Sequence, residues 1–408
     1  MGSVGVGALN YLYYPILGRM LPPTAFGEVQ TLVSFFLQLS IFLTVLGLVT
    51  VNVAANYDNI EHRNRVIFDL ERIALAVSLV LLVLSFIFSG QLQHFFQFDD
   101  ALPFVILMLA IVVSVPFTFR GAYVRGRHGF GVSSISNVLA SAAKIVLSVG
   151  LVAAGLGTVG AIWGVAIAQL VALIYIAFWA RRMGLTRGEG VKWLSKPDMG
   201  LLTPELKYAG MVLVTSLLIT LQFSIDILVV KHYFDATTAG LYAGIATVAR
   251  IIFFLTGSIS QVLMPMVKLK NPAGENRSLL KKSFYLLAVT GLPALLLFVV
   301  LPSTIIRILM GGQYDQYAEL LPLLSVTIFA VAIVNLVVSY FMALRRYTIA
   351  LVVIAGALIT YTLMIFHHDT LRAVIESLLF GSLSMIILVA GLVAGNSWIK
   401  NRGRKQVS

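Results

Sequence analysis

The stretch VSSISNVLASAAKIVLSVGLVAA, residues 132–154, decides the fold. It is long enough to cross a hydrocarbon core of about 30 Å as a helix, which takes about 20 apolar residues. Its single charged residue is Lys144, and a charge at the centre of a membrane helix costs roughly 2.5–3.5 kcal/mol on insertion scales. Lys144 therefore faces a water-filled cavity, which we favour, or it snorkels or pairs inside the protein, or the span is misplaced.

Apolar stretches of this kind recur along the whole chain. Of its 408 residues, 59% are hydrophobic and 11% are charged, with a mean hydropathy of +0.95, whereas a soluble domain carries about 25% charged residues. We therefore predict an all-α polytopic membrane protein. The start has no basic segment and no small-residue cleavage site, so no cleavable signal peptide is expected. Cysteine is absent, which excludes disulfides, thiolate nucleophiles and cysteine metal sites.

The hydropathy pattern predicts about twelve transmembrane helices. They are 3–18, 26–53, 67–89, 102–119, 132–154, 158–180, 207–230, 239–265, 281–301, 318–341, 347–366 and 371–394. The longest polar connector, 181–207, separates the first six from the last six. It divides the chain into an amino-terminal six-helix bundle (1–185), a cytoplasmic linker (186–206) and a carboxyl-terminal six-helix bundle with a basic cytoplasmic tail (207–408).

The basic residues are distributed unevenly between the two sides of these spans. If the amino terminus is cytoplasmic, nearly all loop lysines and arginines face the cytoplasm, and the other side has only Arg19, Lys231, Arg307 and Arg372. By the positive-inside rule, both termini then lie in the cytoplasm and the chain resides in the cytoplasmic membrane. The net charge of +12 thus reflects the orientation of the spans in the membrane and indicates no nucleic-acid partner. It would also attract anionic lipid headgroups to the cytoplasmic side.

The two halves of the chain resemble each other weakly. Each begins with a short turn and a helix start rich in small residues, which puts Gly27 and Gly240 in equivalent places. Each also has a basic cytoplasmic hinge between its fourth and fifth spans. Internal repeats are common in transporters, whose substrate sites lie near the midplane between the repeats.

Two local motifs have simpler interpretations than a cofactor or metal site. GLGTVG at 155–160 matches the dinucleotide pattern, but it joins two membrane spans and no strand precedes it. Gly160 and Gly164 are spaced as in a small-xxx-small pair, which favours close helix packing. FHHD at 366–369 has adjacent histidines that point to different faces of a helix, so we predict no metal site.

Polar residues form a stripe along the fifth span. Ser134, Asn137, Ser141, Lys144 and Ser148 follow steps of three and four residues, which places them on one face of a helix. Small hydroxyl residues in such a stripe can serve helix packing alone. Packing does not require an ammonium group, so Lys144 favours a wet interior.

Other spans carry polar residues that would face the same interior. Arg250 lies deep in the eighth span, and Asp226 in the seventh span is its natural partner, with Gln222 one turn earlier. A structural Asp226–Arg250 pair and a direct role of Arg250 in substrate binding are equally supported. Gln38 in the second span and Asn335 in the tenth add amides, so several helices turn polar faces inward.

Four stretches resemble the oligosaccharide and polysaccharide flippase family, whose members include O-antigen and exopolysaccharide translocases. They are PILGRMLPPTAFGEVQTL (15–32), the region from the fourth to the sixth span (119–164), FSIDILVVKHYFDATTAGLYAGIATVARI (223–251) and QVLMPMV (261–267). This family is part of the multidrug/oligosaccharidyl-lipid/polysaccharide exporter superfamily. One departure is the short first span, with little sequence before Val4.

The resemblance implies two six-helix bundles that face each other across a central cavity open alternately to each side. It implies a cargo made of a glycan joined to a polyprenyl lipid through phosphate or pyrophosphate, flipped across the cytoplasmic membrane for cell-surface polysaccharide biosynthesis. The partners would be this lipid-linked oligosaccharide, membrane lipids and glycan assembly or export machinery. No catalytic step and no cofactor is expected.

The cargo suggests a role for each polar residue in the spans. An anionic group requires Lys or Arg, and sugar hydroxyls require Asn, Gln and Ser. We expect Lys144 and Arg250 to attract the phosphate, and Arg120 and Arg125 to assist loading at the inner mouth. The amides that line the glycan path would be Asn137, Gln38, Gln222 and Asn335. Asp226 and Glu376 are the candidates for coupling the cycle to a proton or sodium gradient.

Several other functions compete with this hypothesis. A cation-coupled multidrug exporter of the same superfamily would use intramembrane carboxylates, whereas the deep charges here include two bases. A flippase for the peptidoglycan lipid precursor would have extra spans. A membrane glycan polymerase or ligase would require a large outer loop with catalytic residues, and the outer loops are short. A channel would require a pore loop or a ring-forming repeat, and neither is evident.

Overall fold

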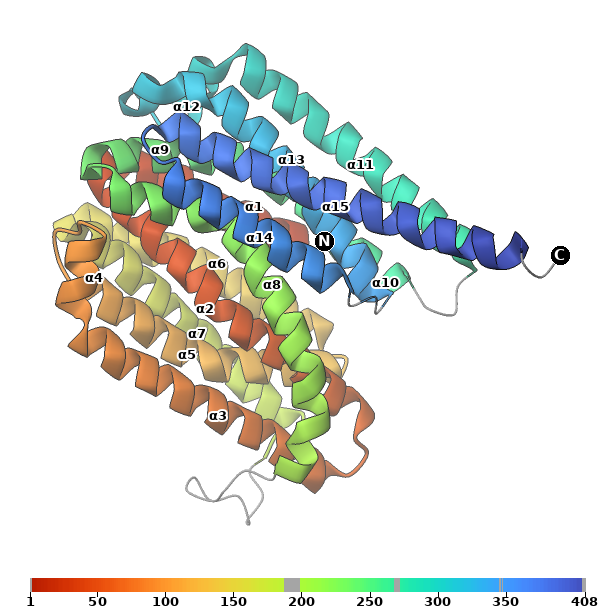
Figure 1. Ribbon diagram of the computed structural model, residues 1–408. Helices are drawn as coiled ribbons and strands as arrows, with labels where there is room; N and C mark the ends of the chain where they lie inside the picture. Colours follow the sequence, from red (N-terminus) through yellow and green to blue (C-terminus); the bar gives the residue numbers. More distant parts are fainter. Residues whose placement is uncertain (1, 187–198, 268–271, 345, 347, 406–408) are drawn as a thin grey trace. The chain divides into compact units, whose positions relative to one another are not determined.

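The computed structural model describes residues 2–186, 199–267, 272–344, 346 and 348–405. These residues are almost entirely helical and form no strand (Figure 1). Their contacts group into two compact units: unit 1 is Met1–Leu217 with Phe234–Gly244, and unit 2 is Leu218–Tyr233 with Ile245–Ser408. The predicted linker 186–206 falls largely on residues 187–198, outside the described residues, and its last part from Met199 is helical.

Unit 1 contains the first seven α-helices and parts of the next two. Its helices are α1 (Gly2–Met20), α2 (Pro23–Asn56), α3 (Ile60–Ile87), α4 (Ser89–Phe95), α5 (Leu102–Gly126), α6 (Phe130–Leu151) and α7 (Gly157–Arg182), with the first part of α8 (Met199–Tyr233) and most of α9 (Ala236–Ala249). A π-helical turn, Val152–Leu156, joins α6 to α7.

Unit 2 contains the end of α8, the end of α9 and the remaining helices. These are α10 (Ile251–Met266), α11 (Ala273–Val300), α12 (Pro302–Leu309), α13 (Leu321–Ala343), α14 (Thr348–Phe366) and α15 (Leu371–Lys405). A 3-10 helix at Gly312–Leu320 precedes α13. Hydropathy did not predict α4, α12 or this 3-10 helix, because all three are short and lie in connectors.

Each of the twelve predicted spans overlaps a long helix or helix pair, and the all-α polytopic fold is confirmed. Nine stretches of the described residues are long and apolar enough to cross a membrane, and the pair α9 with Ile251–Ser260 makes a tenth. One of the nine, Phe130–Arg182, covers two predicted spans, α6 and α7. The predicted eighth span is bent by 42° where α9 gives way to α10, at Arg250, which lies between the two helices.

The GLGTVG motif forms the turn of the α6–α7 hairpin, as predicted. Gly155 and Gly157 have φ of +88° and +49°, in the left-handed region that glycine adopts readily. Further along α7, a Cβ on Gly164 would collide with the backbone of Ser148 on α6. The small residue at this position is therefore required for the two helices to pack, as the small-xxx-small pair predicted.

The core of unit 1 is built around α5, which packs against α2, α3 and α7. In Figure 1, α5 lies between α3 and α7. Its side chains Val115, Phe119 and Tyr123 are fully buried. At the end of α5, a Cβ on Gly126 would stand 2.6 Å from the Cβ of Ala54 on α2, so this glycine sets how closely the two helices approach.

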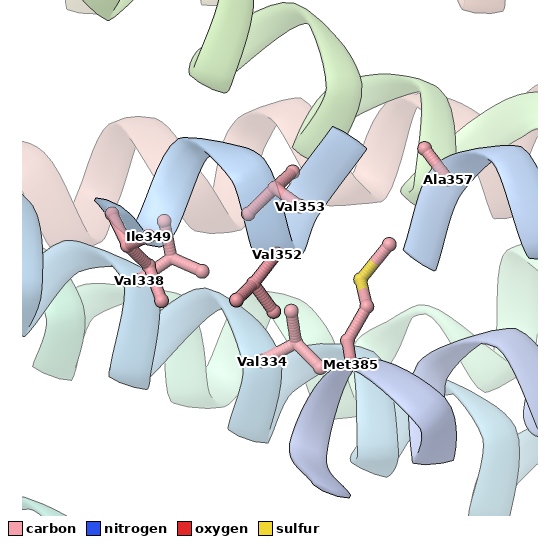
Figure 2. Packing of buried hydrophobic residues seen from close by; sticks show 7 residues of the cluster. All are labelled: Val334, Val338, Ile349, Val352, Val353, Ala357 and Met385. Atoms are coloured by element: carbon pink, nitrogen blue, oxygen red, sulfur yellow. The ribbon is translucent and has the colours of Figure 1, made fainter. Parts of the chain in front are cut away.

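The core of unit 2 includes a cluster where α13, α14 and α15 meet (Figure 2). Its buried residues are Val334, Val338, Ile349, Val352, Val353, Ala357 and Met385. A Cβ on Gly356 of α14 would overlap the side chain of Met385 on α15. A second cluster joins α10, α11 and α13 through Leu263, Leu287 and Leu336.

The two glycines at equivalent places of the two halves meet within unit 1. A Cβ on Gly27 of α2 would stand 2.8 Å from the Cα of Gly240 on α9, and a Cβ on Gly240 would collide with the carbonyl group of Pro23. Backbone thus packs directly on backbone where α2 and α9 begin. Only glycine allows such an approach.

Candidate functional site

A polar cavity of about 280 Å³ lies among α2, α5, α6 and α7 of unit 1. Its lining residues are Thr44, Leu48, Phe117, Thr118, Gly121, Arg125, Ser133, Ser136, Asn137 and Ile176. We call this cavity the Arg125 pocket. It brings together two of the residues predicted to bind substrate, Arg125 and Asn137, which come from different helices.

The local backbone explains why these two side chains meet. Arg125 lies in the last turn of α5, where a cation interacts favourably with the helix dipole. The chain then reverses through a tight turn in which His128 has a φ of +62° and the amide of Gly129 donates to the carbonyl of Val124 at 2.8 Å. The first turns of α6 therefore return beside Arg125 and place Asn137 in the same wall.

The guanidinium of Arg125 is half-buried and has no hydrogen bond or ion pair within the part of the chain that the structure describes. The hydroxyls of Thr118 and Ser133 and the amide of Asn137 also have no partner there. Ser136 is engaged, because its hydroxyl donates to the carbonyl of Ala172 at 3.4 Å. The other groups therefore keep their donors and acceptors available inside the cavity for a ligand.

The Arg125 pocket is chemically suited to an anionic group that also carries hydroxyls. A guanidinium binds phosphate through two parallel charge-assisted hydrogen bonds. Hydroxyl and amide side chains both donate and accept, as sugar hydroxyls require. The volume is just below the usual range of about 300–1,000 Å³ for small-molecule sites, which suits a phosphate with one sugar rather than a large drug.

Lys144, the charge inside the fifth predicted span, is paired within unit 1. Its Nζ donates to Oδ1 of Asn10 on α1 at 2.6 Å and lies 4.5 Å from the centre of the Tyr13 ring. This is the internal pairing considered above, and Lys144 does not line the Arg125 pocket. A substrate role for Lys144 stays a prediction.

Arg250 and Asp226 form an ion pair inside unit 2. Nη2 of Arg250 donates to Oδ1 of Asp226 at 2.6 Å, and Nε and Nη2 also donate to the carbonyl of Phe223 at 3.2 and 3.1 Å. Asp226 is 0% exposed and Arg250 is 6% exposed. The geometry is that of the structural pair, one of the two alternatives that the sequence left open.

The predicted amides of unit 2 are also engaged. The Nε2 of Gln222 donates to the hydroxyls of Thr360 at 3.0 Å and Ser382 at 3.2 Å, which connects α8 to α14 and α15. The Nδ2 of Asn335 donates to the hydroxyl of Ser260 at 3.4 Å. The structure thus places these amides at helix contacts within unit 2, whereas Asn137 lines the Arg125 pocket.

The remaining candidates lie at three other places. Gln38 is half-buried on α2. Nη1 of Arg120 donates to Oε1 of Glu71 on α3 at 2.5 Å, and Arg120 precedes Arg125 along α5 by somewhat more than one helical turn. Glu376 accepts a hydrogen bond from Nε of Arg372 at 2.8 Å in a pair on the outside of α15.

Several buried charges were missed by sequence reasoning. Glu71, 4% exposed, and Asp69, which pairs with Arg72, are buried on α3. Glu28 on α2 accepts hydrogen bonds from the hydroxyl of Thr158 at 2.6 Å and from the backbone of Asp99 at 2.8 Å. A charged run at the start of a helix looks like a solvated surface in sequence, and only long-range contacts show otherwise.

One basic residue assigned by the sequence to the side opposite the cytoplasm, Lys231, is buried among helices. In the structure its side chain is 1% exposed near the end of α8. The helix continues to Tyr233, which keeps Lys231 within packed helices instead of releasing it into a loop.

The fold is that of an all-helical multi-pass membrane protein, and solved structures of membrane transporters share it. An inward-facing multidrug resistance MATE family transporter of the MOP superfamily matches with a TM-score of 0.71 and 15% identity, covering 98% of this chain and 96% of that one. The lipid II flippase MurJ in an inward closed conformation matches with a TM-score of 0.74 and 12% identity, covering 95% and 86%. A eukaryotic MATE transporter matches with a TM-score of 0.63 and 16% identity, covering 100% and 97%.

The chain belongs to the polysaccharide biosynthesis protein family, whose family model matches residues 16–319. This confirms the family that the four stretches of sequence predicted. A comparison with curated protein sequences gives no significant match. At the identities of the solved structures, their similarity shows the shared fold, and the family match adds the link to polysaccharide biosynthesis.

Proposed function

We propose that this protein flips a glycan, joined to a lipid through phosphate or pyrophosphate, across the cytoplasmic membrane for polysaccharide biosynthesis. The family match connects the chain to polysaccharide biosynthesis, and the fold is shared with a lipid flippase and with multidrug transporters. The observation that carries the proposal is the Arg125 pocket, in which an unpaired guanidinium is surrounded by hydroxyls and an amide.

The pocket addresses the physical difficulty of flipping such a lipid. Moving a polar head through hydrocarbon removes its water, and unpaired polar groups or charges are costly to bury. Arg125 would replace water at the phosphate, while Thr118, Ser133 and Asn137 would replace water at the first sugar. The lipid tail needs no such site, because it can remain in the bilayer.

The proposed orientation places this pocket at the loading side. The positive-inside rule puts both termini in the cytoplasm. The end of α5 and the start of α6, where Arg125 lies, then face the cytoplasm, and the basic residues Arg120 and Arg127 lie at the same end. A lipid-linked glycan is made on the side where its activated sugars are available, so a phosphate-binding group here would meet the cargo first.

Coupling to a proton or sodium gradient is part of the proposal, with Asp226 preferred over Glu376. Asp226 is fully buried and paired with Arg250, so neutralising its charge by a proton would release Arg250 and change the packing of α8 against α10. Glu376 forms a solvent-exposed pair within α15, and its neutralisation would change little. No cofactor is needed for this cycle.

The test uses the purified protein in vesicles with a fluorescent polyprenyl-pyrophosphate-linked sugar, whose sidedness is followed with an impermeant quencher. The Arg125→Gln variant should lower the flipping rate about tenfold or more, because it removes a charge-assisted hydrogen-bonding group. Arg125→Lys should retain part of the rate, since the charge remains without the bidentate geometry. The matched control is Arg127→Gln, which removes an exposed charge two residues away.

The outcome separates this function from its main alternative, a cation-coupled multidrug exporter. A wild-type protein that does not move the lipid-linked sugar but exports a cationic dye would overturn the proposal in favour of the exporter. Equal flipping by wild type and Arg125→Gln would show that the Arg125 pocket is not the cargo site. Equal loss in Arg125→Gln and Arg127→Gln would show a general effect of charge.

A further inference from the structure

A second cavity, of about 430 Å³, lies in unit 1 on the other side of α5. Arg120 of α5 lines it, Glu71 and Arg72 line it from α3, and Ala177, Ala180 and Arg181 line it from α7. We call it the α3–α7 groove. It shares no lining residue with the Arg125 pocket, and its occupant does not depend on the function proposed above.

One end of the α3–α7 groove is closed by the turn that follows α7. The amide of Asn64 on α3 donates to the carbonyls of Gly184 and Thr186, both at 3.0 Å. The hydroxyl of Tyr123 on α5 donates to the carbonyl of Met183 at 2.8 Å. These buried bonds fix the turn that follows α7 against both neighbouring helices, so the end of the groove is closed by ordered backbone.

Glu71 and Arg181 each bring to the groove a polar group that has no hydrogen bond within the described residues. Glu71 uses one carboxylate oxygen, Oε1, to accept from Arg120, while its other oxygen, Oε2, is buried with no hydrogen bond. The guanidinium of Arg181 is exposed and has no ion pair or hydrogen bond among the described residues. The third arginine, Arg72, is held by Asp69 through its Nη2, and its Nε is buried without a hydrogen bond. The groove therefore offers one cation and one buried acceptor at the same time.

Apolar surface continues from this polar end along both walls. Leu79, Val83 and Phe86 are exposed along α3 on the face that carries Phe68 and Arg72, deeper in the span than Glu71. Ile174 and Phe178 are exposed along α7 before Arg181. In a membrane protein such faces contact lipid chains, so an occupant with a polar head in the groove could lay its hydrocarbon along α3 and α7.

We propose that the α3–α7 groove binds phosphatidylethanolamine. The phosphate would accept hydrogen bonds from Arg181 and Arg120, and the ammonium group would donate to Oε2 of Glu71. A zwitterionic headgroup satisfies both unpartnered groups, which a simple anion does not, because a phosphate alone would leave the Glu71 oxygen buried without a donor. Basic pockets between helices bind anionic lipid headgroups, and here the acceptor on Glu71 would select a headgroup that also carries an ammonium.

The test is native mass spectrometry of the delipidated protein with equal amounts of phosphatidylethanolamine and phosphatidylcholine, whose headgroup has no hydrogen to donate. Wild type should retain phosphatidylethanolamine about tenfold better, because the difference is one hydrogen bond to a charged group. Glu71→Gln should abolish this discrimination. Arg181→Gln should weaken both lipids equally, and Arg182→Gln, whose native guanidinium stacks over Phe178 and Trp179, is the matched control.

Three results decide the proposal. Equal retention of the two lipids by wild type would overturn it, as would unchanged discrimination in Glu71→Gln. Stronger binding of phosphatidylglycerol than of phosphatidylethanolamine would also overturn it. Phosphatidylglycerol is an anion without an ammonium group, so its preference would show that the groove selects negative charge alone. If Glu71→Gln does not fold, Arg181→Gln still tests the phosphate contact, because its side chain is exposed. Lipid retention is measured without transport, so failure here leaves the flippase proposal intact.

Discussion

Two arginines, one in each unit, differ in what they contact inside the helices. Arg250 in unit 2 is buried, and its guanidinium is held by Asp226 and by the carbonyl of Phe223. Arg125 in unit 1 is half-buried, lines a cavity with hydroxyls, and has no partner for its side chain among the described residues. A buried cation that is fully paired is explained by the fold. A cation without a protein partner in a cavity lined by hydroxyls is available to bind a ligand.

The comparison changes which residues are tested first for a role in transport. Depth in a span favoured Lys144 and Arg250 as phosphate-binding groups, because both lie far from the predicted interfaces. Both have partners inside their own unit. The sequence assigned to Arg125 only a role in loading the cargo. Of the three residues, it is the one whose side chain has no hydrogen-bond partner among the described residues. A cation without a protein partner is therefore a better candidate for binding substrate than a cation that lies deep in a span but is already paired.

The largest effect is expected when the Arg250 pair is broken. Asp226→Asn should lower the free energy of unfolding by about 3–5 kcal/mol, because it leaves Arg250 buried without its counter-ion. Thermal unfolding in detergent measures this as a lower Tm or a loss of folded protein. The double variant Asp226→Leu with Arg250→Met should recover most of the stability. A single variant as stable as wild type would contradict the structural role of the pair.

The double variant also tests coupling. If Asp226 couples the cycle to an ion gradient, the stable double variant should flip its lipid without dependence on an imposed proton or sodium gradient. If the pair serves the fold alone, the gradient dependence of wild type should persist. The comparison is made only between proteins that fold, so stability and coupling are separated.

A smaller effect is expected at the Lys144 pair. Asn10→Leu should lower the free energy of unfolding by about 1–2 kcal/mol, the range found for hydrogen bonds between membrane helices, because the ammonium of Lys144 keeps only the Tyr13 ring. Lys144→Met should restore stability in that background. The flipping rate of Lys144→Met with normal protein levels is the readout for function: an unchanged rate assigns Lys144 to packing, and a loss of rate would assign it to the cargo path.

Arg125 should behave in the opposite direction from Arg250. Arg125→Met should raise the free energy of unfolding by about 1 kcal/mol, the usual scale of gain when a residue kept for function is replaced by one suited to packing, while the flipping rate falls. Unfolding in detergent and flipping in vesicles are measured on the same preparations. A variant that loses stability and flipping together would mean that Arg125 has a structural partner, and the contrast between the two arginines would disappear.

The fold could be predicted from the sequence because its strongest signal is local. Apolar runs of about 20 residues identify membrane helices one at a time, and each of the twelve overlaps a helix of the structure. The bend at Arg250 was missed, because a hydropathy window shows length and not direction. The short helix α4 was missed for a related reason, since its seven residues are too few to show a period.

The candidate site was predictable only in part, because it depends on contacts between distant residues. Arg125 and Asn137 were each named as binding residues, yet they were given separate roles, and only the turn between α5 and α6 puts them in one pocket. The partner of Lys144 is Asn10, which lies 134 residues away in sequence and carries no signal of its own. The spacing of residues in the sequence shows which face of a helix they share, but it does not show which other helix that face contacts.

The smallest effect is expected at Glu376, the other candidate for ion coupling. Its carboxylate accepts from Arg372 one turn earlier on α15, in a pair exposed to the surroundings, and exposed pairs of this kind contribute little. Glu376→Gln should therefore leave the Tm and the gradient dependence of flipping unchanged. The measurement is the flipping rate with and without an imposed proton gradient, with Glu319→Gln as a control for loss of an acid in unit 2. A loss of gradient dependence in Glu376→Gln alone would move coupling from a buried pair to an exposed one and remove Asp226 from that role.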